Sequence, residues 1–202
     1  LPGNGGTSIL AENIKGDIND FDFIKNLVIE KNISMVFVGP EDPIVNGIYD
    51  YFKSSPNLKN IKIIAPSKLA GSLEGSKDFA KDFMEKYNIP TARHKTFTAD
   101  NINEADTFLE SMTPPYVLKA DGLAAGKGVL IISDLIEAKK ELRRMILDEK
   151  FGTASLKVVI EEFLEGIELS CFVLTDGKNY KTLPFAKDYK KIGEGDKGLN
   201  TG

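Results

Sequence analysis

A glycine-rich loop between two apolar segments is the feature that most limits what this chain can fold into. Residues 119–128 read Lys-Ala-Asp-Gly-Leu-Ala-Ala-Gly-Lys-Gly, with apolar β-type segments at 116–118 and 129–132. Glycines let backbone N–H groups approach a polyphosphate closely, and lysines add positive charge. The pattern predicts two strands joined by a loop that lies over phosphates as a lid. An ordinary hairpin with an exposed lysine turn is the alternative.

The loop does not have the spacing of the Walker A phosphate-binding motif. That motif needs G-x-x-x-x-G-K-[ST] before a helix, whereas Gly122 and Gly126 are one residue too close. Gly128 stands where the magnesium-binding hydroxyl would be, and a β-type segment follows. A lid over phosphates is therefore favoured over a cradle at a helix N-terminus.

Composition and charge exclude several classes of partner. The 202 residues are 42% hydrophobic and 28% charged, as in ordinary globular proteins of one or two domains. A net charge of −4 argues against nucleic acid or an anionic membrane as the main partner. No apolar segment has the length of a membrane span, and no signal peptide is recognisable. These features indicate a cytoplasmic protein.

Residues suited to nucleophilic catalysis or to metal binding are scarce. Cys171 is the only cysteine, and the alternation around it predicts a strand with the thiol packed in a core. His94 is the only histidine, which excludes a histidine-based metal site. Its polar surroundings do not suggest a Ser-His-Asp triad. A protein nucleophile is therefore not expected.

The first 66 residues alternate helical and strand signals. A helix capped by Asp20 and another starting near Pro43 and continuing through Phe52 are predicted. The apolar strands 35–38 and 61–65 favour a parallel sheet covered on both faces. Ligands of such sheets lie beyond the carboxyl ends of the strands, where Glu41 follows the first strand. Glu41 is either a ligand residue or an N-terminal helix carboxylate.

The second half of the chain predicts a different architecture. A helix from about Ser76 to Tyr87 places Lys77 and Lys81 one turn apart, and from the sequence alone this pair is an exposed, solvated face. Closely spaced strands then indicate a small antiparallel α+β unit. They are expected at 116–120, 128–133, 157–164 and 169–175, with one helix near 134–148.

Two further motifs carry groups that suit a nucleotide. Residues 158–166 form a strand that ends in Glu-Glu-Phe-Leu-Glu-Gly, which offers backbone groups beside an apolar surface, as an adenine ring requires. Glu168 then suits ribose hydroxyls, and an exposed strand end with solubilising charges is the alternative. The charged, glycine-rich segment 187–202 is either a disordered linker or a binding loop closed by Asn-Thr-Gly.

Together these motifs resemble the phosphoribosylamine–glycine ligase family, the glycinamide ribonucleotide synthetases, which are ATP-grasp enzymes of purine biosynthesis. The resemblance covers essentially the whole chain in order. It is carried by residues 2–7, 38–43, 73–84, 89–92, 118–129, 159–170, 188–191 and 195–202.

The resemblance implies an α/β fold in which an incomplete parallel-sheet N-terminal domain, the pre-ATP-grasp domain, precedes part of an α+β ATP-grasp domain. The implied boundaries are 1–75 for the first domain, 76–113 for the start of the ATP-grasp region, 114–174 for its lid subdomain and 175–202 for the start of its C-terminal subdomain. Both ends of the chain fall in loops, and no initiator methionine is present. We therefore expect a piece of a longer enzyme, inactive alone and monomeric as a whole.

The implied reaction joins glycine to 5-phosphoribosylamine through a glycyl phosphate, with ATP and Mg²⁺ or Mn²⁺. The resemblance assigns ATP to Lys77, Lys119, Gly122, Gly126, Lys127 and Gly128, with Glu161 and Leu164 on adenine through their backbone and Glu168 on ribose. It assigns 5-phosphoribosylamine to Gly3, Asn4, Gly5, Gly6, Thr7, Gly39, Pro40 and Glu41. It assigns glycine and the acyl phosphate to Asp188, Lys190, Asp196, Asn200 and Thr201. For Lys77 this replaces the interpretation as an exposed residue.

The chain also departs from the family pattern. Lys191 stands where arginine is common, and lysine loses bidentate geometry toward phosphate or carboxylate. Leu199 stands where proline is frequent. The family's first strand with its glycine-rich loop is missing, and its metal ligands are expected beyond Gly202. The alternatives are another ATP-grasp carboxylate–amine ligase, a biotin-carboxylase-like enzyme or a non-catalytic nucleotide-binding module.

Overall fold

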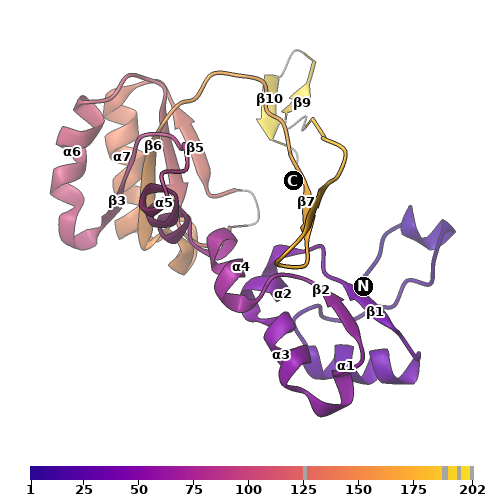
Figure 1. Cartoon of the computed structure of the whole chain (residues 1–202). Helices are drawn as coiled ribbons and strands as arrows, with labels where there is room; N and C mark the ends of the chain where they lie inside the picture. Colours follow the sequence, from indigo (N-terminus) through magenta and orange to yellow (C-terminus); the bar gives the residue numbers. More distant parts are fainter. Residues whose placement is uncertain (125–126, 188–190, 195–196, 201–202) are drawn as a thin grey trace.

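The structure, a computed structural model, describes residues 1–124, 127–187, 191–194 and 197–200. Two packed regions follow one another along the chain and are joined at Ser76, between α4 (Lys68–Gly75) and α5 (Lys77–Lys86). Two small hairpins lie beside them (Figure 1). A parallel sheet in one region and an antiparallel sheet in the other confirm the expected mixed α/β fold.

The first region is built on a parallel pair of strands, β1 (Met35–Phe37) and β2 (Lys62–Ile64). Buried apolar side chains of α1 (Phe21–Glu30) and α3 (Ile48–Ser54) form its core. The cap of α1 is confirmed, because Asp20 accepts a hydrogen bond from the Phe23 N–H at 2.9 Å. Three short elements complete the region: η1 (Thr7–Ile9), α2 (Glu41–Asn46) and η2 (Pro56–Leu58).

Two expectations for this region were wrong. The helix predicted from Pro43 through Phe52 is divided into α2 and α3 at Gly47, whose φ of +94° ends the first helix. The sheet is not covered on both faces of β1, since Met35 and Phe37 are exposed.

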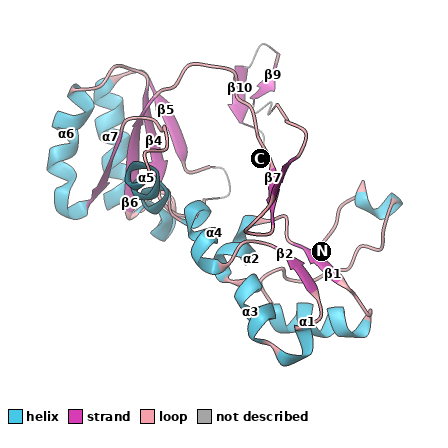
Figure 2. Ribbon diagram, in the orientation of Figure 1, coloured by secondary structure: helices cyan, strands magenta, loops and turns pink. Residues whose placement is uncertain are grey.

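The second region contains a four-stranded antiparallel sheet in the order β3-β6-β4-β5 (Figure 2). Its strands are β3 (His94–Thr98), β4 (Tyr116–Ala120), β5 (Val129–Ile132) and β6 (Lys157–Glu162). The short η3 (Ala99–Asn101) leads into α6 (Ile102–Glu110), α7 (Leu135–Leu147) follows β5, and η4 (Gly152–Ser155) precedes β6.

The two faces of this sheet differ in character because side chains alternate along a strand. One face carries fully buried Leu118, Ala120, Val158 and Ile160, which pack with α6 and α7. On the other face the register places Val117 opposite Glu161 and Lys119 opposite Val159. This second face carries charged side chains, and it lies toward α5.

The structure corrects the strand expected at 169–175. Only Val173–Thr175 (β7) forms a strand, paired with β8 (Tyr180–Thr182), while Ser170 makes an isolated bridge to Ala186. Cys171 is exposed and is not a core thiol. The strand expected at 157–164 ends at Glu162. The second hairpin pairs β9 (Lys191–Gly193) with β10 (Lys197–Asn200).

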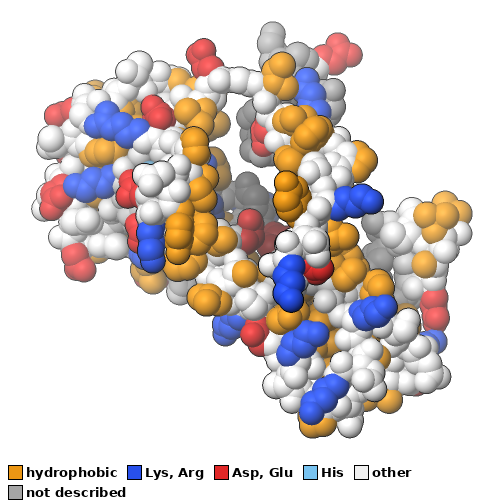
Figure 3. Space-filling view, viewed as in Figure 1, with side chains coloured by type: hydrophobic (Ala, Val, Ile, Leu, Met, Phe, Trp, Pro, Cys, Tyr) orange, Lys and Arg blue, Asp and Glu red, His pale blue; other side chains and the backbone are white. Residues whose placement is uncertain are grey.

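Hydrophobic side chains are gathered along the β7 hairpin on the face seen in Figure 3. Phe172, Leu174, Leu183 and Phe185 are among the exposed residues. The side chains of these short strands are exposed on both faces, so their alternation does not bury either face against the described residues. Among the described helices, none has the length and apolar character needed to cross a membrane.

Candidate nucleotide-phosphate site

A cluster of lysines surrounds a buried carboxylate between α5 and the charged face of the sheet. The Oε2 atom of Glu161 accepts a hydrogen bond from Lys119 Nζ at 2.9 Å and lies 3.2 Å from Lys81 Nζ. Lys81 also donates to Thr91 Oγ1 at 2.8 Å. Lys81 and Glu161 are both buried. The cluster joins α5, β4 and β6, which are far apart in the sequence.

The prediction that Lys81 lies on an exposed face was wrong. Lys81 is the one residue of α5 that is buried, whereas Phe79 on the same helix is exposed. The helix therefore turns Lys81, and not Phe79, toward the sheet. This orientation is stable because the buried ammonium finds a carboxylate and a hydroxyl there.

Lys77 lies at the start of the same helix and is only partly exposed. Its Nζ donates to the carbonyl oxygens of Asp121 and Gly122, each at 3.3 Å. Burial lowers the pKa of the Lys77 amine; the carboxylates of Asp121 and Glu74 oppose this shift, and the charge of Lys119 adds to it. Because these acceptors are uncharged carbonyl groups, they do not neutralise the positive charge of Lys77, which can attract an incoming anion.

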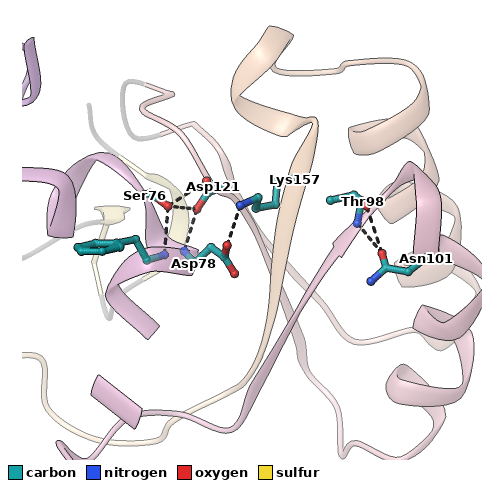
Figure 4. Close-up of polar contacts among 7 residues, drawn as sticks. Ser76, Asp78, Thr98, Asn101, Asp121 and Lys157 are labelled. Atoms are coloured by element: carbon teal, nitrogen blue, oxygen red, sulfur yellow. Dashed lines mark hydrogen bonds and ion pairs between the residues drawn. The ribbon is translucent and has the colours of Figure 1, made fainter. Parts of the chain in front are cut away.

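The start of the glycine-rich loop is fastened to α5 by Asp121 (Figure 4). Its carboxylate accepts hydrogen bonds from Ser76 Oγ at 3.0 and 3.1 Å and from the Asp78 N–H at 2.8 Å. Ser76 in turn caps the helix by accepting from the Phe79 N–H. The first turn of α5 is therefore satisfied by protein groups, and the loop begins at a fixed point beside Lys77.

A second link ties α5 to the sheet, since Lys157 Nζ lies 2.6 Å from Asp78 Oδ2. Partial burial alone would raise the pKa of Asp78, but hydrogen bonds from Lys157 and Thr96 outweigh it and lower that pKa overall. The same contact raises the pKa of Lys157. Both residues are therefore charged at neutral pH, and the pair holds the helix over the sheet.

Both ends of the loop are closely packed at glycine. The Gly122 N–H donates to the Ala154 carbonyl at 3.2 Å, so its use by a phosphate would require that bond to be exchanged. A Cβ atom at Gly128 would lie 2.8 Å from the Cβ of Ala124, which only glycine avoids. Lys127 is exposed. Gly126 lies outside the described residues.

The remaining predicted nucleotide residues follow β6. Leu164 and Glu168 are exposed on the segment that leaves the sheet. The side chain of Glu161 is used in the lysine cluster, and its backbone lies within the sheet, opposite His94 of β3 and Val117 of β4. The adenine and ribose assignments stay predictions.

The residues expected to hold 5-phosphoribosylamine lie in two places of the first region. Gly39 and Glu41 border a hollow together with residues of α2 and α4. Residues 3–7 form an exposed turn in which Asn4 and Thr7 bond each other, with the Thr7 N–H 2.9 Å from Asn4 Oδ1. They do not line that hollow.

The loop expected to close on glycine falls largely outside the described residues. Asp188, Lys190, Asp196 and Thr201 lie outside them, and Asn200 is described only as a backbone position of β10. Within the described part of the chain, no group of three His, Cys, Asp or Glu side chains could hold a metal ion. The described residues therefore do not fit a metal centre.

Comparisons with known proteins identify the family. A family model described as phosphoribosylglycinamide synthetase, ATP-grasp (A) domain, matches residues 75–202, and one described as its N domain matches residues 1–74. The chain belongs to the phosphoribosylglycinamide synthetase family. The matches leave no described residue outside the family's two domains.

Relatives of the synthetase family match the chain over its whole length. A phosphoribosylamine–glycine ligase of Haemophilus influenzae is 43% identical over 100% of this chain and 46% of its own length. A bifunctional purine biosynthetic protein of Dictyostelium discoideum is 45% identical over 100% of the chain and 24% of its own length. The chain thus spans about half the length of the single-function relatives.

A solved structure of the same family also matches the chain. The crystal structure of phosphoribosylamine–glycine ligase from Thermotoga maritima superposes with a TM-score of 0.74 at 34% identity, covering 99% of this chain and 46% of that one. A biotin carboxylase of Campylobacter jejuni has a TM-score of 0.68 at 17% identity, covering 86% of this chain and 39% of that one. The second likeness shows a shared fold alone.

Two residues of the site were missed by sequence reasoning. Lys81 and Asp121 carry most of the contacts described above. Both lie in segments that carry the resemblance, 73–84 and 118–129, but neither was assigned a role there. The i,i+4 spacing of Lys77 and Lys81 was a usable signal, because it places two cations on one helical face. Without knowledge of what covers that face, exposure and burial could not be distinguished.

We expect Asp121→Ala to lower the free energy of unfolding by about 1–2 kcal/mol, because a helix cap made by a carboxylate is lost. We also expect weaker nucleotide binding, because the loop loses its attachment beside Lys77. Urea unfolding and nucleotide titration measure the two effects.

Asp134→Ala is the matched control. Asp134 caps α7 by accepting from the Glu137 N–H at 2.8 Å, which places its contact outside the described part of the loop. The Asp134→Ala variant should lower the free energy of unfolding by a similar amount and leave nucleotide affinity unchanged. Equal loss of affinity in both variants would show that Asp121 acts only through general stability.

Proposed function

We propose that this chain contains the phosphoribosylamine-binding and nucleotide-binding parts of an ATP-dependent ligase that joins glycine to 5-phosphoribosylamine. The products are glycinamide ribonucleotide, ADP and phosphate. Identity of 43–45% to enzymes of this name over the whole chain is the observation that carries the proposal. The lysine pair Lys77 and Lys119 beside the root of the glycine-rich loop supports it from the geometry.

In this proposal the reaction takes place in two transfers. The carboxylate of glycine attacks the γ-phosphorus of ATP, the bond to the bridging oxygen breaks, and ADP leaves with that electron pair. The amine of 5-phosphoribosylamine then attacks the carbonyl carbon of glycyl phosphate. Phosphate departs and the amine loses a proton. Neither transfer requires a protein nucleophile.

The chain's own residues would contribute position and charge. Lys77 and Lys119 would neutralise phosphate oxygens, and the glycine-rich loop would cover them and exclude water. Glu41, at the hollow between α2 and α4, would hold ribose hydroxyls of 5-phosphoribosylamine. Leu164 and Glu168 would meet the nucleoside.

The remaining assignments rest on the family alone. A divalent cation, Mg²⁺ or Mn²⁺, is expected, but the described residues do not provide its site, and no step above is routed through it. The loop 188–201 would close on glycine and the acyl phosphate. The domain boundaries at residues 75, 113 and 174, a monomeric state and a cytoplasmic location are proposals of the same kind.

The test compares this 202-residue chain with the full-length protein. We expect the full-length protein to form ADP and glycinamide ribonucleotide only when ATP, glycine and 5-phosphoribosylamine are all present. The 202-residue chain should form none, because the described residues leave the triphosphate without a metal site. Product from the chain alone would contradict the second expectation.

The same assay separates the rival functions. Turnover of the full-length protein with another carboxylate and amine, but not with glycine and 5-phosphoribosylamine, would indicate a different ATP-grasp ligase. Nucleotide binding without turnover for any acceptor would indicate a non-catalytic module. Either result would overturn the proposed function.

A further inference from the structure

Glu161 is shared between two lysines that differ in how firmly they are held. Both reach the same carboxylate oxygen, Lys119 at 2.9 Å and Lys81 at 3.2 Å. The side chain of Lys81 is 8% exposed and that of Lys119 is 28% exposed. Lys81 has a second acceptor, Thr91 Oγ1 at 2.8 Å. Lys81 is therefore a fixed partner of Glu161, and Lys119 a partner that can move.

The backbone explains this arrangement. Lys119 on β4 is opposite Val159 on β6, so Glu161 is its diagonal neighbour on one sheet face, within reach of a long side chain. Lys81 approaches from α5 above that face. The three side chains carry a net charge of +1, and Lys77 on the same helix adds another positive charge nearby.

We propose that Lys81 is a positioning residue for nucleotide binding: it keeps Glu161 neutralised so that Lys119 can exchange this carboxylate for a phosphate oxygen. The proposal rests on the proposed function, because it takes ATP as the ligand of Lys119. Lys81 itself would not touch the nucleotide.

The reason is the cost of a buried, unpaired charge. Removing one partner of a buried ion pair leaves the other without compensation, which is strongly unfavourable. If Lys119 were the sole counterion of Glu161, each nucleotide would have to separate that pair in order to bind. With Lys81 in place, Glu161 keeps a positively charged partner when Lys119 moves away. A phosphate can then bind Lys119 at little cost in free energy.

Four proteins test the proposal at full length: the unaltered protein, Lys81→Met, Glu161→Gln and the double variant. Binding of a non-hydrolysable ATP analogue is measured by calorimetry. We expect Lys81→Met to raise the dissociation constant about tenfold, as for other broken charge networks. The double variant should bind as Glu161→Gln does, because Lys81 has no charge left to compensate.

The comparison of the double variant with Glu161→Gln does not depend on Lys81→Met being folded. In Glu161→Gln the Lys81 ammonium keeps Thr91 Oγ1 as an acceptor at 2.8 Å, and the double variant contains neither buried charge. Lys95→Met removes a lysine from the same sheet, where it pairs with Glu104 at 3.0 Å, and should leave the dissociation constant unchanged.

The outcomes separate this inference from the function on which it rests. No binding by the unaltered protein would overturn both. Binding that Lys81→Met leaves unchanged, or a double variant that binds about tenfold more weakly than Glu161→Gln, would overturn the inference alone.

Discussion

Replacing Lys119 with methionine is expected to weaken ATP binding by about 10- to 150-fold, which corresponds to the ~1.5–3 kcal/mol of a charged hydrogen bond. Lys119 lies on the face of β4 that meets α5, beside Lys77 and next to the root of the glycine-rich loop. Methionine keeps most of the length and apolar stem of the side chain and removes the charge. Glu161 keeps Lys81 as a partner at 3.2 Å, so the fold should tolerate the change.

Nucleotide titration of the full-length protein measures this effect, and steady-state assays with varied ATP show whether turnover falls with it. Lys95→Met is the control, because it removes the same charge from the neighbouring region of the same sheet. A specific phosphate contact predicts a large loss for Lys119 and little change for Lys95. Similar losses in both variants would mean that the overall electrostatic field, and not a placed contact, governs affinity.

The largest effect on stability is expected at Phe97. We expect Phe97→Ala to lower the free energy of unfolding by about 3–5 kcal/mol, the usual range for a large aromatic residue removed from a core. Phe97 is 0% exposed on β3, and its ring centroid lies 5.7 Å from that of Phe108 on α6, at an interplanar angle of 51°. Its loss would leave a cavity between the edge strand and the helix.

Urea unfolding of the protein, followed by circular dichroism, measures the change in free energy. Leu147→Ala provides the comparison, because Leu147 ends α7 and is 55% exposed. Its removal should cost well under ~1 kcal/mol, since surface substitutions usually have small effects. A loss below about 1 kcal/mol for Phe97→Ala would show that β3 and α6 contribute little to the cooperative unit.

Local patterns in the sequence were sufficient for many elements of the fold. Continuous apolar segments predicted β1, β2 and β4, and cap residues predicted α1 and α5, because hydrophobic burial and capping act on neighbouring positions. β3 and α6 were not predicted. The strand 94–98 reads His-Lys-Thr-Phe-Thr, and its only fully buried residue is Phe97. Such a strand is defined by pairing with β6, which lies about 60 residues later in the chain.

For the candidate site, the sequence by itself determined the glycine-rich loop, its lysines and, through the family resemblance, the nucleotide as ligand. These features depend on residue type and local spacing. Burial of individual side chains was not determined in this way. Cys171 was expected in a core and is exposed, while Lys81 was expected in solvent and is buried. Only the packing of α5 against the sheet decided that Lys81 is buried.

The contacts that organise the site join residues distant in sequence. Ser76 and Asp121 are 45 positions apart, and Lys119 and Glu161 are 42 apart. A carboxylate or an ammonium is costly to bury unless a partner of opposite charge is supplied. For Glu161, Lys81 and Asp121, those partners come from other strands and helices. The sequence therefore determined which chemical groups are available, and the tertiary structure decided which of them are paired and which can turn to a ligand.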